Sequence, residues 1–149
     1  MRIISGLLRG KSINFVRNFN TRPLRDNVKE SIFNILEHSN SIDIDIEKSS
    51  ILDLYSGVGS FGIECISRGA QKVTFVENNE NTFKILKNNL TSLSIFKKAN
   101  TFNNTVENVL MKKKKIKFDI FFLDPPFKDK SFFINLSFIK KNKMYKKKN

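Results

Sequence analysis

The sequence predicts an α/β fold, in which a parallel β-sheet is covered by helices on both faces. Strand and helix patterns alternate strictly from residue 50 onward, and the predicted strands are almost continuously apolar, as strands buried on both faces are. The turn Gly57-Val-Gly59-Ser-Phe-Gly62 follows the first of these strands and has the spacing of nucleotide-binding turns. With 149 residues, 40% of them hydrophobic, the chain can form one domain with a sizeable core and is not a disordered protein.

The predicted elements follow one another in a regular order. Residues 2–15, punctuated by two glycines, predict a short β-hairpin. A helix capped by Asp26 follows Pro23, and its predicted buried face consists of Val28, Ile32, Ile35 and Leu36. After a polar loop, strands predicted at 50–55, 72–77, 95–101 and 118–123 alternate with helices at 60–68, 80–93 and 104–112. We expect residues 1–38 to pack on a core formed by residues 39–149 as one structural domain, with a lysine-rich tail from about residue 128.

The charge distribution points to a polyanionic partner. The net charge is +13, and it divides into +5 for residues 1–30, +1 for residues 31–127 and +7 for residues 128–149. A nearly neutral centre between basic ends is typical of a folded core that meets a nucleic acid through its ends. Compositional drift toward Lys, Asn, Ile and Phe is an alternative explanation for the C-terminal lysines. It does not explain the arginines at positions 2, 9, 17, 22 and 25.

The remaining composition favours a cytoplasmic location. No apolar run approaches the roughly 20 residues of a membrane span, and the first residues lack the apolar region of a signal peptide. One cysteine, Cys65, excludes a disulfide framework and is expected to fill the core. His38, at a predicted helix end, is expected to be solvated. The sequence indicates no membrane partner and no metal site.

Three acidic residues and one glycine fall where predicted strands end, and parallel sheets bind ligands at that edge. They are Asp53, Gly57, Glu77 and Asp124. Glu77 lies where an acid would bind a ribose, which NAD and S-adenosylmethionine (SAM) share. Asp53 separates the two, because a carboxylate would repel the pyrophosphate of NAD but attract the ammonium and sulfonium of SAM. The sequence therefore favours SAM.

SAM is a methyl donor, and the stretch "FDIFFLDPPF", residues 118–127, indicates which chemical group would accept the methyl group. Prolines lack N–H donors, so the loop presents carbonyl oxygens. Asp124 and the Pro125 carbonyl could both accept hydrogen bonds from one exocyclic –NH₂ group, and Phe127 could stack on a base. With Pro126, these residues are the predicted catalytic loop. Read as structure alone, the motif is a strand terminator.

The chain resembles the RsmD-type bacterial 16S ribosomal RNA guanine-N2 methyltransferases, a family within the Rossmann-like SAM-dependent class. The resemblance lies in "MRIISGLLRGK", "TRPLRDNVKESIFNIL", "ILDLYSGVGSFGIECISRGAQKVTFVE" and "FDIFFLDPPF", and extends from residue 1 to about residue 127. The last motif alone would be shared with adenine-N6 DNA methyltransferases. The first two make the resemblance specific, and they imply an enzyme that acts on 16S ribosomal RNA or the small-subunit particle.

The resemblance also implies residue roles. The methionine end of SAM would be held by Asp53, Tyr55, Gly57 and Gly59, its ribose by Glu77, and its adenine would lie near Asn104. The loop from Asp124 to Phe127 would position the N2 amine of guanine. RNA phosphates would be bound by Arg2, Arg9, Lys11, Arg22 and Arg25.

The chain departs from the family after the catalytic loop. Only 22 residues follow Phe127, whereas the family continues with a helix, a further strand and a closing hairpin, so these C-terminal strands are expected to be missing. Residues 118–123 would then be an apolar sheet edge. A truncated enzyme is the favoured interpretation. A monomer is expected, with a dimer through this edge as the alternative. An inactive RNA-binding remnant and an adenine-N6 DNA methyltransferase remain competing functions.

Overall fold

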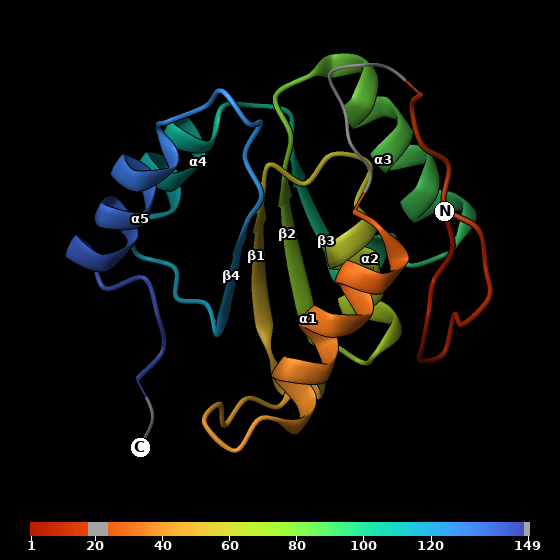
Figure 1. The fold of residues 1–149 in the computed structure, drawn as a ribbon. Coiled ribbons are helices and arrows are strands. Elements are labelled where there is room, and N and C mark those ends of the chain that lie inside the picture. Colours follow the sequence, from red (N-terminus) through yellow and green to blue (C-terminus); the bar gives the residue numbers. More distant parts are fainter. Residues whose placement is uncertain (18–23, 148–149) are drawn as a thin grey trace.

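The computed structural model describes residues 1–17 and 24–147, and its centre is a parallel sheet (Figure 1). Within these residues the sheet has four strands in the order β3-β2-β1-β4. Their bounds are β1 (Ser50–Leu54), β2 (Lys72–Val76), β3 (Ala99–Phe102) and β4 (Ile120–Leu123). In register, Leu52 of β1 lies opposite Thr74 of β2 and Phe121 of β4. The predicted α/β fold with a parallel sheet is confirmed, although β3 begins later than residue 95.

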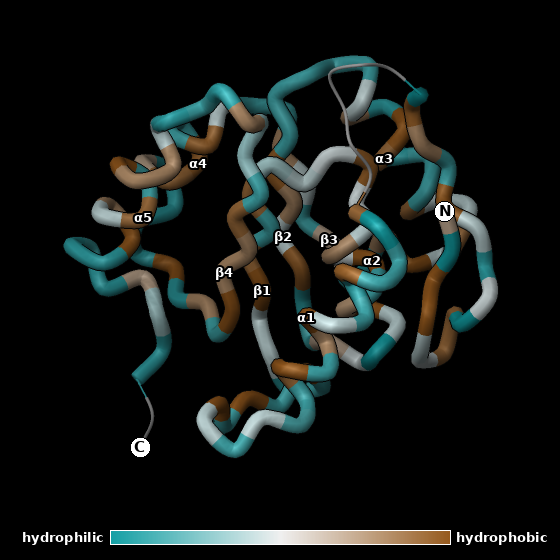
Figure 2. Tube along the Cα trace, viewed as in Figure 1, coloured by the Kyte–Doolittle hydropathy of each residue, from teal (hydrophilic) through white to brown (hydrophobic). Residues whose placement is uncertain are grey.

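Helices cover both faces of the sheet. The α-helices are α1 (Asp26–His38), α2 (Ser60–Ser67), α3 (Glu80–Ser92), α4 (Val106–Lys113) and α5 (Phe132–Lys141), with 3-10 turns at Ile46–Lys48 and Phe96–Lys98. Helices α1, α2 and α3 lie on one side of the sheet and α4 and α5 on the other (Figure 1). Alternate strand residues serve the two sides, because Ile51 packs with the first group and Leu52 with the second. Figure 2 shows many of the hydrophobic residues in the strands, whereas the connecting loops are largely hydrophilic.

The strand order reverses at β1. From β1 the chain moves through α2 to β2 and through α3 to β3, and then α4 returns it to β4 on the opposite side of β1. Right-handed crossovers in opposite directions place α2 and α3 on one face and α4 on the other. The carboxyl ends of β1 and β4 thus form a topological switch point, where open α/β sheets bind ligands.

The buried side of α1 agrees with the predicted one in part, since Ile32 and Leu36 pack against the core. Val28 and Ile35 are 44% and 56% exposed, whereas Lys29 and Phe33 are fully buried. The Lys29 ammonium lies 3.3 Å from the carboxylate of Glu64 in α2, so a buried opposite charge makes its burial tolerable. Hydrophobic periodicity thus identified Ile32 and Leu36 correctly but missed Lys29, because it cannot detect an ion pair between two helices.

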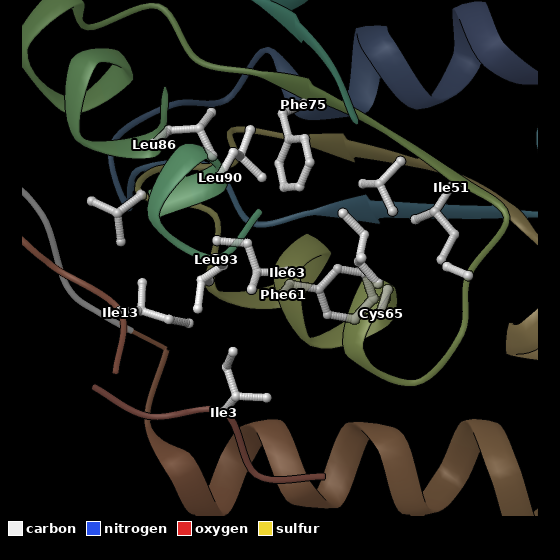
Figure 3. Packing of buried hydrophobic residues seen from close by; sticks show 14 of the residues in the cluster. Ile3, Ile13, Ile51, Phe61, Ile63, Cys65, Phe75, Leu86, Leu90 and Leu93 are labelled. Atoms are coloured by element: carbon white, nitrogen blue, oxygen red, sulfur yellow. The ribbon is translucent and has the colours of Figure 1, made fainter. Parts of the chain in front are cut away.

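Helix α2 lies in the middle of the larger core. Figure 3 shows its residues Phe61, Ile63 and Cys65 between the sheet and α1. The ring of Phe61 stacks on Phe33 of α1 and on Phe122 of β4, with centroid distances of 5.2 and 3.9 Å. Cys65 is fully buried, which agrees with its predicted role as a core residue, and burial raises the pKa of its thiol. The core thus fixes α2, whose first residues face the switch point.

The N-terminal segment forms a short hairpin, as predicted, with one antiparallel bridge between Arg2 and Ser12. Backbone hydrogen bonds of 2.9 Å from Ile3 N–H to the Lys11 carbonyl and from Ile13 N–H to the Met1 carbonyl join its two sides. Two further N–H groups, of Ile4 and Ser5, each donate a 3.0 Å hydrogen bond to the Glu64 carboxylate and so attach the hairpin to α2.

The C-terminal segment packs under β4. Ile139 of α5 and Met144 are buried against the face that α4 covers. Phe118 pairs with Tyr145 just before β4 begins. Among the described residues no strand pairs with the outer side of β4 itself, so β4 is a sheet edge, as predicted.

Candidate cofactor and catalytic site

The turn between β1 and α2 requires its glycines for three different reasons. Gly57 and Gly59 have φ angles of +57° and +96°, a region that L side chains rarely adopt. A Cβ on Gly59 would lie 2.6 Å from Leu86, whereas a Cβ on Gly57 would meet no atom within 4 Å. A Cβ on Gly62 would lie 2.3 Å from the buried ring of Phe75, so this glycine permits close helix–strand packing. The open space beside Gly57 lies at the switch point, where a ligand is expected.

Asp53, the fourth residue of β1, is completely buried beneath this turn. Its Oδ2 accepts a 3.1 Å hydrogen bond from the Gly62 N–H, and its Oδ1 has no partner. Burial raises its pKa well above the usual range; the Gly62 hydrogen bond lowers it, and the carboxylates of Asp124 and Glu77 raise it further. A buried carboxylate with an unpartnered oxygen is a site that a cation would stabilise.

Glu77, directly after β2, is hydrogen-bonded to the turn between β1 and α2. Its two oxygens accept hydrogen bonds from the backbone N–H groups of Gly57, at 2.9 Å, and Asn79, at 2.7 Å. A carboxylate offers about four acceptor positions, so two remain for the hydroxyls of a ligand.

The two asparagines after β3 have different partners. Asn103 donates to the carbonyl oxygens of Glu77 and Asn78, at 2.9 and 3.2 Å, and so joins the ends of β3 and β2. The side-chain oxygen of Asn104 accepts from the N–H of Thr105 and from the Asn108 amide. Asn104 thus lies at the predicted edge, with its oxygen already hydrogen-bonded.

The loop after β4 completes the site. The pKa of Asp124 is raised by partial burial, and its carboxylate has no hydrogen-bond partner among the described residues. The Pro126 carbonyl accepts a 2.8 Å hydrogen bond from the Asp129 N–H, which turns the loop back toward α5. Pro125 is half-buried and Phe127 is fully exposed. The loop therefore combines an exposed aromatic ring with a carboxylate, Asp124, that raises the pKa of Asp53.

The predicted RNA-binding residues do not all lie together. Arg2 and Arg25 lie beside the start of α1, and Arg2 forms an exposed 3.5 Å ion pair with Asp26. Arg9 and Lys11 are exposed in the N-terminal loop, whose tip lies at the end of α2, because Leu7 N–H donates to the Ser67 carbonyl. Arg22 is outside the described residues.

The family described as conserved hypothetical protein 95 matches residues 1–149 of this sequence. The chain belongs to this family, the RsmD family. It is 38% identical over 129 residues to ribosomal RNA small subunit methyltransferase D of Haemophilus influenzae, covering 85% of this chain and 64% of that protein. It is 31% identical to the protein of the same name from Escherichia coli K12, over 86% of this chain and 61% of that protein.

Solved structures of relatives have the same fold. The yhhF protein of Escherichia coli superposes with a TM-score of 0.81 at 29% identity, over 95% of this chain and 73% of that one. The chain spans 61–64% of the two curated RsmD relatives named above. No helix among residues 1–17 and 24–147 has the length and apolar character needed to cross a membrane.

Proposed function

We propose that this RsmD-family protein transfers a methyl group from SAM to the exocyclic N2 amine of a guanine in 16S ribosomal RNA. The observation that carries the proposal is the meeting, at one sheet edge, of a buried carboxylate with an unpartnered oxygen and a Pro-Pro loop with free acceptors. The names of the relatives support ribosomal RNA of the small subunit as the substrate.

The residues at the turn fit SAM. The unpartnered Oδ1 of Asp53 suits the ammonium of the methionine part, Glu77 has acceptor positions left for ribose hydroxyls, and the space beside Gly57 is open. Asn104 and Tyr55 lie at the same edge. Bound SAM would supply a methyl carbon made electrophilic by the attached sulfonium.

The loop orients the nucleophile. The Asp124 carboxylate and the Pro125 carbonyl each accept one N–H of the guanine amine, Pro126 holds the loop, and Phe127 stacks on the base. With SAM bound, the amine nitrogen would form a bond to the methyl carbon as the carbon–sulfur bond broke, and the nitrogen would then lose one proton. The raised pKa of Asp124 makes its carboxylate a suitable acceptor for that proton. Orientation and electrostatics supply the catalysis.

We expect Asp124→Ala to lower the rate of methylation by about 10²-fold or more, because the guanine amine loses one hydrogen-bond acceptor. Binding of S-adenosylhomocysteine and RNA should persist, since Asp124 has no hydrogen-bond partner among the described residues. Methyl incorporation from labelled SAM into 16S RNA, followed by nucleoside analysis, measures this. Asp45→Ala, an exposed acid ahead of β1 at the opposite sheet end, is the control.

Nucleoside analysis of the wild-type reaction also separates the alternatives. Detection of N2-methylguanosine in the RNA would support the proposal. Detection of N6-methyladenine in duplex DNA would instead show that the protein is an adenine-N6 DNA methyltransferase. A folded wild-type protein that binds RNA but transfers no methyl group would be the inactive remnant.

The basic residues beside the site should contribute a salt-dependent share of RNA affinity. Exchanging both Arg2 and Arg25 for Gln should lower the slope of log affinity against log salt by about 0.7–0.9 for each RNA phosphate that the variant no longer binds. Exchanging Lys48 and Lys97, exposed residues at the amino end of the sheet, removes the same charge and should change the slope little. Equal slopes for both double variants would refute phosphate binding beside the site. Fluorescence anisotropy over a salt series gives the slopes.

A further inference from the structure

Tyr55 has an unusual backbone conformation for its residue type. Its φ is +59°, in the left-handed region that a side chain with a Cβ rarely adopts, and it lies between Asp53 and Gly57. Its side chain leaves the turn and meets α5, the helix after the catalytic loop. The Tyr55 hydroxyl accepts a 2.8 Å hydrogen bond from Asn135 Nδ2 and lies 3.5 Å from Ser131 Oγ.

Asn135 is a buried polar residue in a largely apolar stretch of α5. It is 2% exposed, and its Nδ2 donates both to Tyr55 and, at 3.0 Å, to Glu107 Oε1 of α4. Both of its amide protons therefore have acceptors, which fixes the side chain in place. An amide side chain in the largely apolar stretch "FFINLSFI" was the available sequence signal for this contact.

Ser131 continues the connection into the catalytic loop. Its hydroxyl and its N–H both donate to Asp129 Oδ1, at 2.5 and 2.8 Å. The Asp129 N–H in turn donates to the carbonyl of Pro126. Because the Ser131 proton is directed to Asp129, the Tyr55 hydroxyl is the donor in its contact with Ser131. A continuous series of hydrogen bonds thus joins the turn beneath the cofactor to the loop that holds the base.

We propose that the Tyr55 hydroxyl is a positioning group that couples the cofactor turn to the loop from Asp124 to Phe127. This inference rests on the proposed function and adds a link between its two halves. Binding at the turn would order the loop through Tyr55, Ser131 and Asn135, and the loop would then hold the amine in line with the methyl group. Tyr55 acts on the end of the loop that leads into α5. The other end of the loop is held by β4, which ends at Leu123.

Tyr55→Phe tests the coupling, because it removes one oxygen and keeps the ring. We expect S-adenosylhomocysteine affinity within about twofold of wild type, methylation turnover lower by about tenfold, and an unchanged KM for RNA. Hydrogen exchange gives a readout that needs no RNA. In the wild type, S-adenosylhomocysteine should slow amide exchange across residues 124–131, and in Tyr55→Phe this slowing should disappear.

Tyr145→Phe is the matched control. Tyr145 is partly exposed, lies near the amino end of β4, and makes no side-chain hydrogen bond within the described residues. It should behave as wild type in every assay. Adding Asn135→Leu to Tyr55→Phe should lower turnover little further, since Tyr55→Phe already removes the hydroxyl that both Asn135 and Ser131 contact.

The outcomes separate the two claims. If the wild type binds S-adenosylhomocysteine but Tyr55→Phe retains both the slowed exchange and full turnover, the coupling is overturned and the proposed function stands. A parallel loss of affinity and turnover would also overturn it, since that result indicates a structural role. If the wild type does not bind the ligand, the proposed function itself fails and the coupling fails with it.

Discussion

Asp53→Asn is expected to weaken S-adenosylhomocysteine binding by about 100-fold, in line with hydrogen bonds to charged groups, while making the ligand-free protein more stable. The loss follows because an amide cannot offer the unpartnered Oδ1 of Asp53 as a charged acceptor. The gain follows because a fully buried carboxylate is disfavoured without a cation beside it. The gain should lie within the roughly 0.5–2 kcal/mol that single stabilising substitutions commonly give.

The stability effect should depend on pH. Burial raises the pKa of Asp53, so the folded protein binds this proton more tightly than the unfolded chain does. The contribution of Asp53 to stability is therefore fully present below the ordinary carboxyl pKa and is lost as the pH rises through the raised one. The advantage of Asp53→Asn should be largest above the raised pKa and should shrink as the pH falls toward the ordinary range. Thermal unfolding across pH measures the difference.

Asp119→Asn is the control for this experiment. Asp119 Oδ2 accepts a 2.7 Å hydrogen bond from the Ser50 N–H and pairs with Lys146 at 2.9 Å, at the opposite end of the sheet. Its loss should lower stability and leave ligand binding intact. If Asp53→Asn bound the ligand as the wild type does, the assignment of Asp53 to the cofactor would be wrong.

Glu64→Gln should have the largest effect on stability. The Glu64 carboxylate accepts hydrogen bonds from Ile4 N–H, Ser5 N–H and Arg68 Nε, each at 3.0 Å, and lies 3.3 Å from the Lys29 ammonium. Both side chains of the Lys29–Glu64 pair are fully buried. Glu64→Gln removes the negative charge and leaves the Lys29 ammonium buried without an opposite charge, which costs about 3–5 kcal/mol. The thermal midpoint should fall by about 10 °C for a chain of this length.

The two halves of the ion pair should not be equivalent. After Lys29→Met, Glu64 retains Arg68 and two backbone donors, whereas after Glu64→Gln the buried ammonium retains only the Arg2 carbonyl and the Ser60 hydroxyl. We therefore expect Lys29→Met to be the milder change. Equal losses would contradict the assigned role of Arg68.

The exposed Lys84–Glu80 pair is the control for these two variants, since breaking it should cost at most about 1 kcal/mol. Chemical denaturation with two probes gives the three free energies of unfolding.

The sheet edge that carries the candidate site could be predicted from local patterns. Parallel strands bring their carboxyl ends together, so placing Asp53, Glu77 and Asp124 after predicted strands was enough to place them at one edge. The glycine spacing likewise depends on the turn and the helix that follows it. The carboxylates of Asp124 and Glu77 both raise the pKa of Asp53, which agrees with this placement.

The sequence by itself determined the fold class, the position of the turn and the family, because periodicity and turn chemistry are properties of neighbouring residues. Only the tertiary structure decided that Lys29 is buried, that Asp53 has an unpartnered oxygen, and that Tyr55 meets Asn135 eighty residues later. Each of these depends on a partner from a distant segment. A polar side chain is buried when such a partner satisfies its hydrogen bonds or charge, and no local pattern records where that partner lies.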